Sequence, residues 1–285
     1  MERNRRIATW AGAVLGIMFA LAMNVVAADA IEERTRALSE EFHHSYPLTP
    51  NGTVELENIN GAVHIASWDR NEVKLDAVKR ADDQEALNDA EIEVNNRADS
   101  VSIRTAYRNE EGYHGHGHGA AEVEYTLTVP ASARLDEIKL INGLLDISGV
   151  TGEVRASCIN GKLLAHGLSA KVKLSTVNGS LEATFERLEG NTIELASVNG
   201  HLRVTLPSDV KAAIDATTVH GDINNDFGLA LERHHLVGQH LRGDLGGGGS
   251  IVRLRNVNGA IDIAHANDGR ALSPAHSSTK GESDI

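Results

Sequence analysis

The stretch VKLSTVNGSLEA, residues 172–183, decides the fold, because the chain repeats it with the same spacing of apolar residues. Copies in the same frame are IELASVNGHLRV at 193–204, VRLRNVNGAIDI at 252–263 and VELENINGAVHI at 54–65. The central dipeptide recurs along the chain as Asn60-Gly61, Asn142-Gly143, Asn160-Gly161, Asn178-Gly179, Asn199-Gly200 and Asn258-Gly259, with His220-Gly221 as a near copy. From Asn142 to Asn199 the steps are 18 to 21 residues. A fixed period near 20 residues is typical of a solenoid, in which one coil cannot bury its apolar face alone.

The apolar residues around each dipeptide predict two short strands per coil, each with one face turned inward. In residues 172–183 the predicted inner positions are Val172, Leu174, Val177, Leu181 and Ala183. The segments between coils contain turn-forming residues and one apolar residue each, which predicts a short third side. The apolar residues of this third side are Val150, Leu168 and Leu188.

Asn-Gly between two strands also has a simpler interpretation as a two-residue β-hairpin turn, because both residues tolerate positive φ. Seven hairpins would make an antiparallel meander or barrel. Coils stacked in parallel would instead place the asparagines above one another, where their amides can hydrogen-bond along the stack. We favour the second arrangement: an all-β, single-stranded parallel β-solenoid, or β-helix, of about 18–21 residues per coil.

The chain divides into four parts. Arg3, Arg5 and Arg6 precede an uncharged run, and a small-residue cleavage site follows, so residues 1–28 are predicted to be a signal peptide, with a retained membrane anchor as the alternative. Residues 29–50 form a polar lead-in, 51–265 the β-solenoid and 266–285 a disordered tail. One short helix is expected at 82–90, with Asp82 or Asp83 as its N-cap.

The net charge of −13 argues against nucleic acid and anionic lipid surfaces as partners. The alternating charged residues of the strands form the solvated outer face. Cys158 is the single cysteine, so no internal disulfide can form, and its place in a strand predicts a buried or half-buried thiol.

Catalysis would require clustered reactive side chains. The chain has no zinc-protease helix motif, no nucleophile elbow and no phosphate-binding loop, and the sequence predicts no enzyme. Some β-helices do cleave polysaccharides with paired carboxylates on one face. The residues that stacking could bring together for this are Asp146, Glu182, Arg203, Asp222 and Asp262. A solvated face of mixed charge explains them equally well, and only 4% of residues are aromatic, which leaves few side chains for stacking on sugars.

The run Tyr113-His114-Gly115-His116-Gly117-His118-Gly119 is the one candidate metal site. Three imidazoles at alternate positions of a glycine-rich backbone could bind Zn²⁺, Ni²⁺ or Cu²⁺. A solvent-exposed loop between strands is the alternative. The same alternative applies to His234, His235 and His240. No other cofactor is expected.

Residues 50–265 resemble a known bacterial family. The features that carry the resemblance are Leu127-Thr128-Val129-Pro130, the repeated Thr/Ser-Val-Asn-Gly-x-Leu, Leu206-Pro207 and a glycine-rich run before residues 251–263. They are similar to the "putative adhesin" domains of unknown function, in the style of the head-GIN adhesin domains. His220 departs from the pattern, where the family has Asn.

The resemblance implies an exported, non-catalytic envelope protein with an adhesin-like or scaffold role, in the periplasm or at the cell surface. Its partner would be a protein or an envelope polymer, and the solenoid ends could self-associate through unpaired strand edges. Nucleic acid is not a partner, and the membrane is contacted only through residues 1–28 if they stay uncleaved. Periplasmic metal binding and, after it, polysaccharide cleavage are the alternatives.

The metal hypothesis makes a direct prediction. Equilibrium dialysis at neutral pH should show uptake of Zn²⁺ by the wild-type chain, and the variant His114→Ala/His116→Ala/His118→Ala should lose it, because neutral imidazoles are the ligands. No uptake, or uptake that the variant retains, would contradict the hypothesis.

Overall fold

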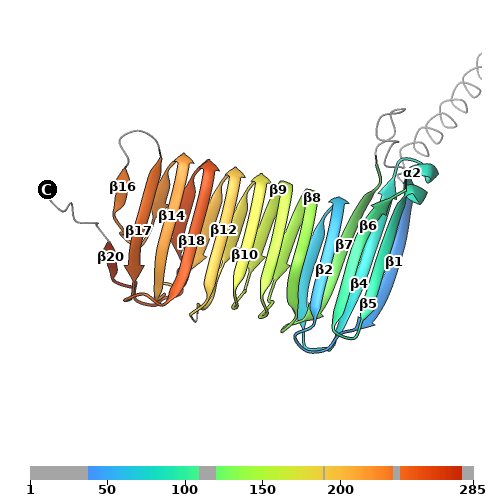
Figure 1. Cartoon of the computed structure of the whole chain (residues 1–285), viewed down its shortest axis with the longest axis horizontal. Coiled ribbons are helices and arrows are strands. Elements are labelled where there is room, and N and C mark those ends of the chain that lie inside the picture. Colours follow the sequence, from blue (N-terminus) through green and yellow to red (C-terminus); the bar gives the residue numbers. More distant parts are fainter. Residues whose placement is uncertain (1–37, 109–119, 189, 234–237, 278–285) are drawn as a thin grey trace, which may run out of the picture.

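Every coil of the protein except the one formed by residues 100–130 consists of two strands that meet at an Asn-Gly or His-Gly corner. The computed structural model describes residues 38–108, 120–188, 190–233 and 238–277. In these residues the strands form one elongated open stack, with β1 (Leu38–Pro47) near one end and β20 (Ala275–Ser277) near the other (Figure 1). The all-β class is confirmed, and the described residues contain one helix, α2 (Gln84–Asp89).

One layer of the stack contains the strands that precede the corners. Neighbouring strands in this layer pair in parallel. In spatial order they are β6 (Ser100–Tyr107), β2 (Thr53–Asn60), the first part of β8 (Arg134–Ser148), the first part of β9 (Val154–His166), β10 (Val172–Asn178), β12 (Thr192–Asn199), β18 (Ser250–Asn258) and β14 (Ala212–His220).

The opposite layer contains the strands that follow the corners, and it is parallel as well. In the same order they are β7 (Glu122–Pro130), β3 (Val63–Trp68), the second parts of β8 and β9, β11 (Leu181–Thr184), β13 (Leu202–Leu206), β19 (Ile261–His265) and β15 (Ile223–Asn225). The two strands of a coil pair with neighbouring coils and not with each other, so the hairpin interpretation of Asn-Gly is wrong for these coils.

The coils do not stack in the order of the sequence. The coil β18–β19 lies between β12–β13 and β14–β15, although it is the last of the three in the chain. At the other end, the early coil β2–β3 stacks between β6–β7 and β8. Asn258 therefore follows Asn199 in space, and His220 comes last.

Both ends of the stack carry antiparallel strands, which corrects the prediction of a single parallel stack. At the N-terminal end β4 (Glu72–Ala81) pairs with β7 and with β1, and β5 (Ala90–Arg97) pairs with β6. The strand β1 falls within the stretch assigned to a polar lead-in. The helix α2 joins β4 to β5, and its N-cap is Asp83, whose carboxylate accepts a hydrogen bond from the Ala86 N–H at 2.8 Å.

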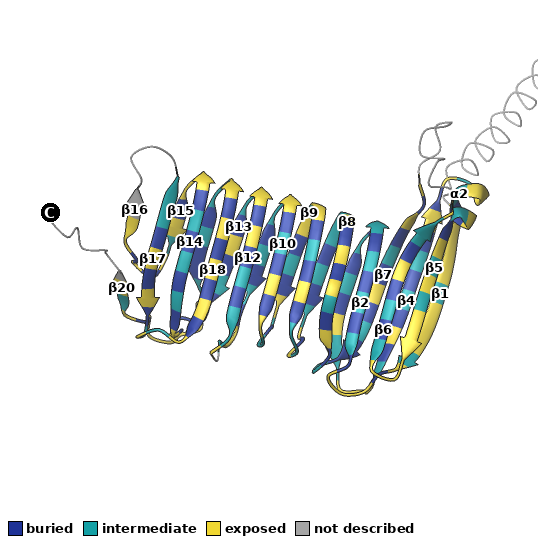
Figure 2. Cartoon of the chain, viewed as in Figure 1, coloured by how far each residue is buried: buried dark blue, intermediate teal, exposed yellow. Residues whose placement is uncertain are grey.

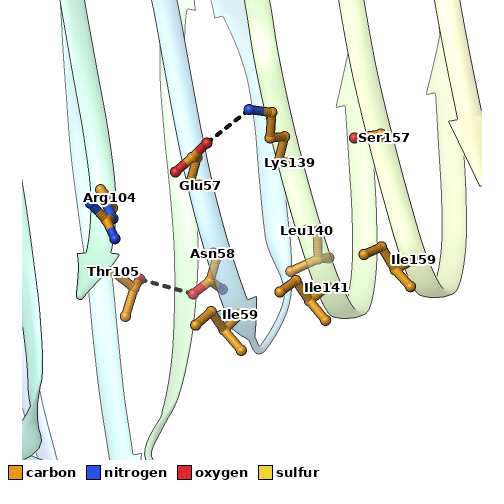
Figure 3. Close-up of a pocket in the computed structure, with 10 residues that line it drawn as sticks. All are labelled: Glu57, Asn58, Ile59, Arg104, Thr105, Lys139, Leu140, Ile141, Ser157 and Ile159. Carbon is orange, nitrogen blue, oxygen red and sulfur yellow. Dashed lines mark hydrogen bonds and ion pairs between the residues drawn. The ribbon is translucent and has the colours of Figure 1, made fainter. Parts of the chain in front are cut away.

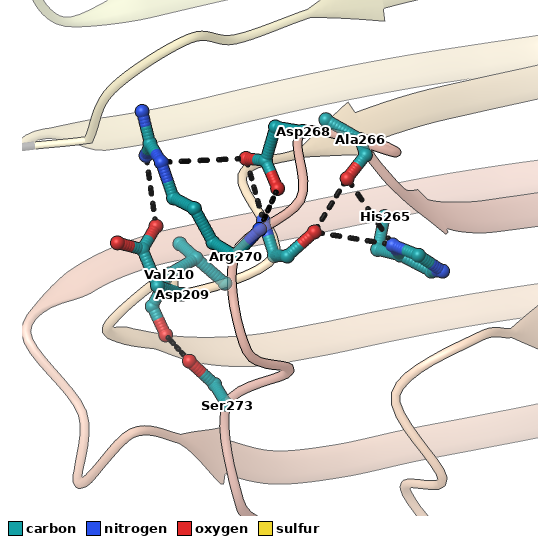
Figure 4. Close-up of polar contacts among 8 residues, drawn as sticks. Asp209, Val210, His265, Ala266, Asp268, Arg270 and Ser273 are labelled. Atoms are coloured by element: carbon teal, nitrogen blue, oxygen red, sulfur yellow. Dashed lines mark hydrogen bonds and ion pairs between the residues drawn. The ribbon is translucent and has the colours of Figure 1, made fainter.

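The C-terminal end is closed by β17 (Gln239–Leu245), which pairs antiparallel with β14 and carries β16 (Leu231–Arg233) and β20. Because β20 lies at 275–277, that part of the predicted disordered tail is a paired strand. Polar contacts join the segment before β20 to the segment between β13 and β14 (Figure 4). Arg270 pairs with Asp209 at 2.9 Å, and the Ser273 hydroxyl donates to the Val210 carbonyl at 2.7 Å.

The core follows the alternation of each strand, visible as alternating buried and exposed bands (Figure 2). Leu174, Leu195 and Leu254 lie in register on neighbouring strands and are at most 1% exposed. On the third side Val150 and Leu168 are buried and Leu188 is partly buried against the core, as the sequence predicts. Cys158 is buried as well, and burial raises the pKa of its thiol to about 11.

The corner glycines allow the coils to approach closely. Gly179 has φ of +145°, and a Cβ there would lie 1.7 Å from the Gly161 carbonyl oxygen. No other residue satisfies both the backbone conformation and the space. The repeat of Gly in the sequence therefore follows from the contact between neighbouring corners.

A matched pair of substitutions tests this contact. Gly179→Ala should lower the free energy of unfolding by roughly 3 kcal/mol or more, because strain and a backbone clash add. Gly190→Ala is the control: its φ is +70°, yet nothing lies within 4 Å of the added Cβ. It should cost only about 1–2 kcal/mol. Equal losses in urea unfolding would show that conformation alone, not the approach of the coils, requires glycine.

Candidate functional site

The turn asparagines lie above one another and join through their side chains. The Asn142 amide nitrogen donates to the Asn60 amide oxygen at 2.8 Å. The same bond repeats at 2.7–2.9 Å from Asn160 to Asn142, Asn178 to Asn160, Asn199 to Asn178 and Asn258 to Asn199. His220 ends the row with its backbone alone: its carbonyl accepts from the Gly259 N–H at 2.7 Å.

This amide row has a direction. Every nitrogen donates toward the N-terminal end, so the row ends with the Asn60 amide nitrogen as an unshared donor among the described residues. Aligned amides polarise one another, which concentrates partial positive charge at that end. The inner amides satisfy each other, so they stabilise the stack and offer little to a reactant.

The residue before each corner dipeptide is aliphatic, β-branched and on the outside of the protein. We call this row the aliphatic stripe. It consists, in spatial order, of Ile59, Ile141, Ile159, Val177, Val198, Val257 and Val219. Ile59 is half-buried, and the other six are 36–42% exposed. With strands about 4.8 Å apart, the stripe is roughly 29 Å long.

The stripe corrects the prediction that Val177 and its equivalents face inward. Val172 and Leu174 set the inward parity of β10, so the next inward residue is Thr176, which is 2% exposed. Val177 has the opposite parity and points to solvent. The three-residue step from Leu174 to Val177 is the signal in the sequence that could have shown this.

A pocket opens at the N-terminal end of the stripe, in the layer of strands that precede the corners (Figure 3). Its volume is about 310 Å³. The aliphatic part of its lining is Ile59, Leu140, Ile141 and Ile159, and the polar part is Glu57, Asn58, Arg104, Thr105, Lys139 and Ser157. The first three residues of the stripe thus belong to the pocket as well.

The pocket exists because β6 separates from β2. The pairing of these strands ends at Glu57 and Arg104, and a buried hydrogen-bond chain fills the space behind it. Thr105 donates its hydroxyl to the Asn58 oxygen at 2.9 Å and lies 2.8 Å from the Tyr125 hydroxyl. Asn58 in turn donates to the Val123 carbonyl at 2.8 Å. Burial raises the pKa of Tyr125 well above its usual range, so the phenol stays neutral.

The charged groups at the pocket differ in their partners. The Lys139 ammonium contacts Glu57 at 2.9 Å and Glu137 at 3.2 Å, and these two hydrogen bonds raise the pKa of the lysine. Arg104 is exposed, and it forms no ion pair within the described part of the chain. Glu93 faces it across β5 and β6 without contacting it as an ion pair.

The carboxylates considered for polysaccharide cleavage lie in the layer after the corners, away from the pocket. Glu182 and Asp262 are separated by Arg203, and Asp146 neighbours Leu164. They do not form a carboxylate pair. Burial alone would raise the pKa of Asp262, but hydrogen bonds from Asn224 and His201 hold it below its ordinary value, which is unsuited to a general acid. Asp222 accepts a hydrogen bond from Gln239 at 2.9 Å.

The histidines considered for metal binding are mostly outside the described residues. This applies to His114, His116, His118, His234 and His235. His240 lies on β17 and contacts the Asp215 carboxylate at 3.2 Å. Across the described ranges, no three His, Cys, Asp or Glu side chains are arranged to hold a metal ion.

The profile of the Toastrack DUF4097 family matches residues 49–264, so this chain belongs to that family. The family agrees with the resemblance drawn from the sequence, whose head-GIN-like character stays a prediction. No curated protein matches the chain. Among the residues described, no helix has the length and apolar character needed to cross a bilayer.

Three solved structures illustrate what the chain is similar to. A "putative cell adhesion protein" from Clostridium sporogenes is 12% identical, covers 81% of this chain and 100% of its own, and gives a TM-score of 0.49. A "putative adhesin" from Bacteroides fragilis is 11% identical, with coverages of 80% and 97% and a TM-score of 0.30. A "putative lipid binding protein" from Parabacteroides distasonis is 11% identical, with coverages of 82% and 98% and a TM-score of 0.24.

The buried chain behind the pocket can be tested by one substitution. Thr105→Val keeps the shape but removes the hydroxyl, which takes the buried hydrogen-bond partner from the Asn58 side-chain oxygen and from the Tyr125 hydroxyl. The free energy of unfolding should fall by roughly 2 kcal/mol. Thr126→Val, on the exposed side of β7, is the control and should stay within about 0.5 kcal/mol of wild type. Similar small effects for both variants would contradict the role given to Thr105.

Proposed function

We propose that this protein is a non-catalytic binding protein of the cell envelope, with an adhesin-like or scaffold role, and that it binds its partner on the aliphatic stripe. Residues 1–28 would direct export, and the mature chain would work in the periplasm or at the cell surface. In the same proposal, the parallel coils are a single-stranded β-solenoid between two antiparallel ends.

The aliphatic stripe is the observation that carries this proposal. Six coils in succession expose an Ile or Val side chain by more than a third, in one continuous row. Scattered exposed apolar residues are ordinary, whereas contiguous apolar patches of a few hundred Å² often mark binding sites. Thr at these positions would suit a strand equally well, so strand propensity alone does not require the aliphatic side chains.

The arrangement of charges supports binding over catalysis. Many charged side chains of the described strands form cross-strand ion pairs, such as Arg155 with Asp136 at 2.9 Å and Arg253 with Glu194 at 3.0 Å. Such pairs give a solvated surface beside the stripe. Metal binding by the His-Gly loop is the second candidate and rests on the dialysis experiment, because its residues lie outside those described.

The proposal is tested by location and by binding together. Protease treatment of intact cells, followed by fractionation, should find the chain in the envelope, either exposed or protected by the outer layer. Purified protein should then co-sediment with envelope fragments. A chain that stays in the cytoplasm would contradict the proposal.

A variant of the stripe makes the binding test specific. Ile159→Thr/Val177→Thr/Val198→Thr keeps the branch at Cβ and should reduce co-sedimentation at least about tenfold, because replacing the Ile ethyl group or a Val methyl group by a hydroxyl removes apolar contact. The control is Leu38→Thr/Ile251→Thr/Leu272→Thr, three exposed apolar residues outside the stripe. Equal binding by wild type and both variants would exclude the stripe as the binding surface.

A further inference from the structure

We infer that the pocket and the adjoining part of the stripe hold one single-chain anionic amphiphile of the fatty-acid type, with its carboxylate at Arg104 and its acyl chain along the stripe from Ile59 to Val198. This inference rests on the proposed function and gives the chemistry of the ligand.

The pocket has the lining that an acyl chain requires. Four aliphatic side chains from three neighbouring strands form one wall, and the first three stripe residues are among them. Figure 3 shows Ile59, Ile141 and Ile159 side by side, and each directly precedes the corner of its coil. Burying the methylene groups of an acyl chain against these side chains is favourable because it removes apolar surface from water.

Beyond the pocket, the surface stays open for a limited length. The outward residues beside Ile159, Val177 and Val198 are small: Ser157, Ser175 and Ala196. On the next strand this position is Arg255, which is held in place by two contacts to the Asp215 carboxylate at 2.9 and 3.0 Å. On β2 and β8 the same position is Glu57 and Lys139, which belong to the polar lining of the pocket. The pocket and the open surface together, from β2 to β12, cover four strand steps, roughly 19 Å. That is the length of an extended acyl chain of about sixteen carbons.

The charged groups at the pocket favour the carboxylate of the ligand at Arg104. Arg104 lines the pocket and has no ion pair among the described residues, whereas Lys139 is shared between Glu57 and Glu137. The amide row also ends as a donor at Asn60, next to Ile59. Both features favour one carboxylate at this end. The acidic net charge disfavours a membrane surface, but charges farther than about 8 Å are screened at physiological salt and do not exclude a single ligand.

A protein partner fits the same surface less well. The stripe is one residue wide, and it exposes far less than the roughly 800 Å² per partner that a stable protein interface buries. The backbone groups of these strands are used within the layer, so a peptide strand cannot add to the face.

The ligand is tested with defined probes below their micelle concentrations. Isothermal titration and native mass spectrometry should show one 16-carbon fatty acid bound per chain. Arg104→Gln should weaken the binding of the fatty acid about tenfold and leave the binding of the uncharged 16-carbon monoacylglycerol unchanged. Only the fatty acid has a carboxylate that pairs with the Arg104 guanidinium. Ile159→Thr/Val177→Thr should weaken both long-chain probes. Ile251→Thr, exposed but outside the stripe, is the matched control and should weaken neither.

Three outcomes would overturn the inference: no uptake of the acid by the wild-type chain, several acids per chain, or uptake that the stripe variant retains. Sedimentation with anionic phospholipid vesicles in place of monomer uptake would also overturn it, in favour of a membrane surface. Melting temperatures of the exposed variants show whether they are folded. Stripe-dependent binding to envelope fragments without uptake of the acid would overturn this inference alone and leave the proposed function in place.

Discussion

The close contact between corner glycines is the constraint on which the rest of the structure depends. At Gly179 and its equivalents the backbone of one coil lies against the carbonyl of the next, where no side chain fits. This contact holds the coils in strict parallel register. Register then places asparagine over asparagine and each preceding Ile or Val over its equivalent. The amide row and the aliphatic stripe are therefore two consequences of one backbone contact.

The site combines this regular stack with one local irregularity. Repetition alone produces a uniform row of aliphatic side chains with no distinct end. The pocket appears where the pairing of β6 with β2 ends, and the buried contacts of Asn58, Thr105 and Tyr125 fill the space behind it. Asn58 occupies the last inward position before the corner, which is Leu140 and Cys158 in the next two coils and Thr176, Ser197, Asn256 and Thr218 in the others. This end is distinguished by the Thr105 hydroxyl, which contacts Asn58 from β6.

Much of the coil architecture could be predicted from the sequence, because the dipeptide period and the alternation of Val172 and Leu174 are local signals. The spatial order could not be, since Asn258 and His220 fit the position above Asn199 equally well by pattern. The strand β1 was missed because its residues are mostly exposed and lack alternation. The pocket depends on contacts between residues 47 positions apart, such as Asn58 and Thr105, which no local pattern reveals. The aliphatic stripe could have been predicted from the alternation of inward and outward residues along each strand.

The insertion of β18–β19 between two earlier coils has a consequence for synthesis. As the chain leaves the ribosome, the coil β14–β15 emerges soon after β12–β13, but its place in the stack is not beside it. The growing chain therefore has an incomplete edge at β12 until residues 250–265 are made. Folding of this end cannot proceed coil by coil from the N-terminus. If β14 paired directly with β12, the coil β18–β19 would have no place in the stack and the chain would be misfolded. In the cell, this exposed edge would be the part of the newborn chain that needs protection.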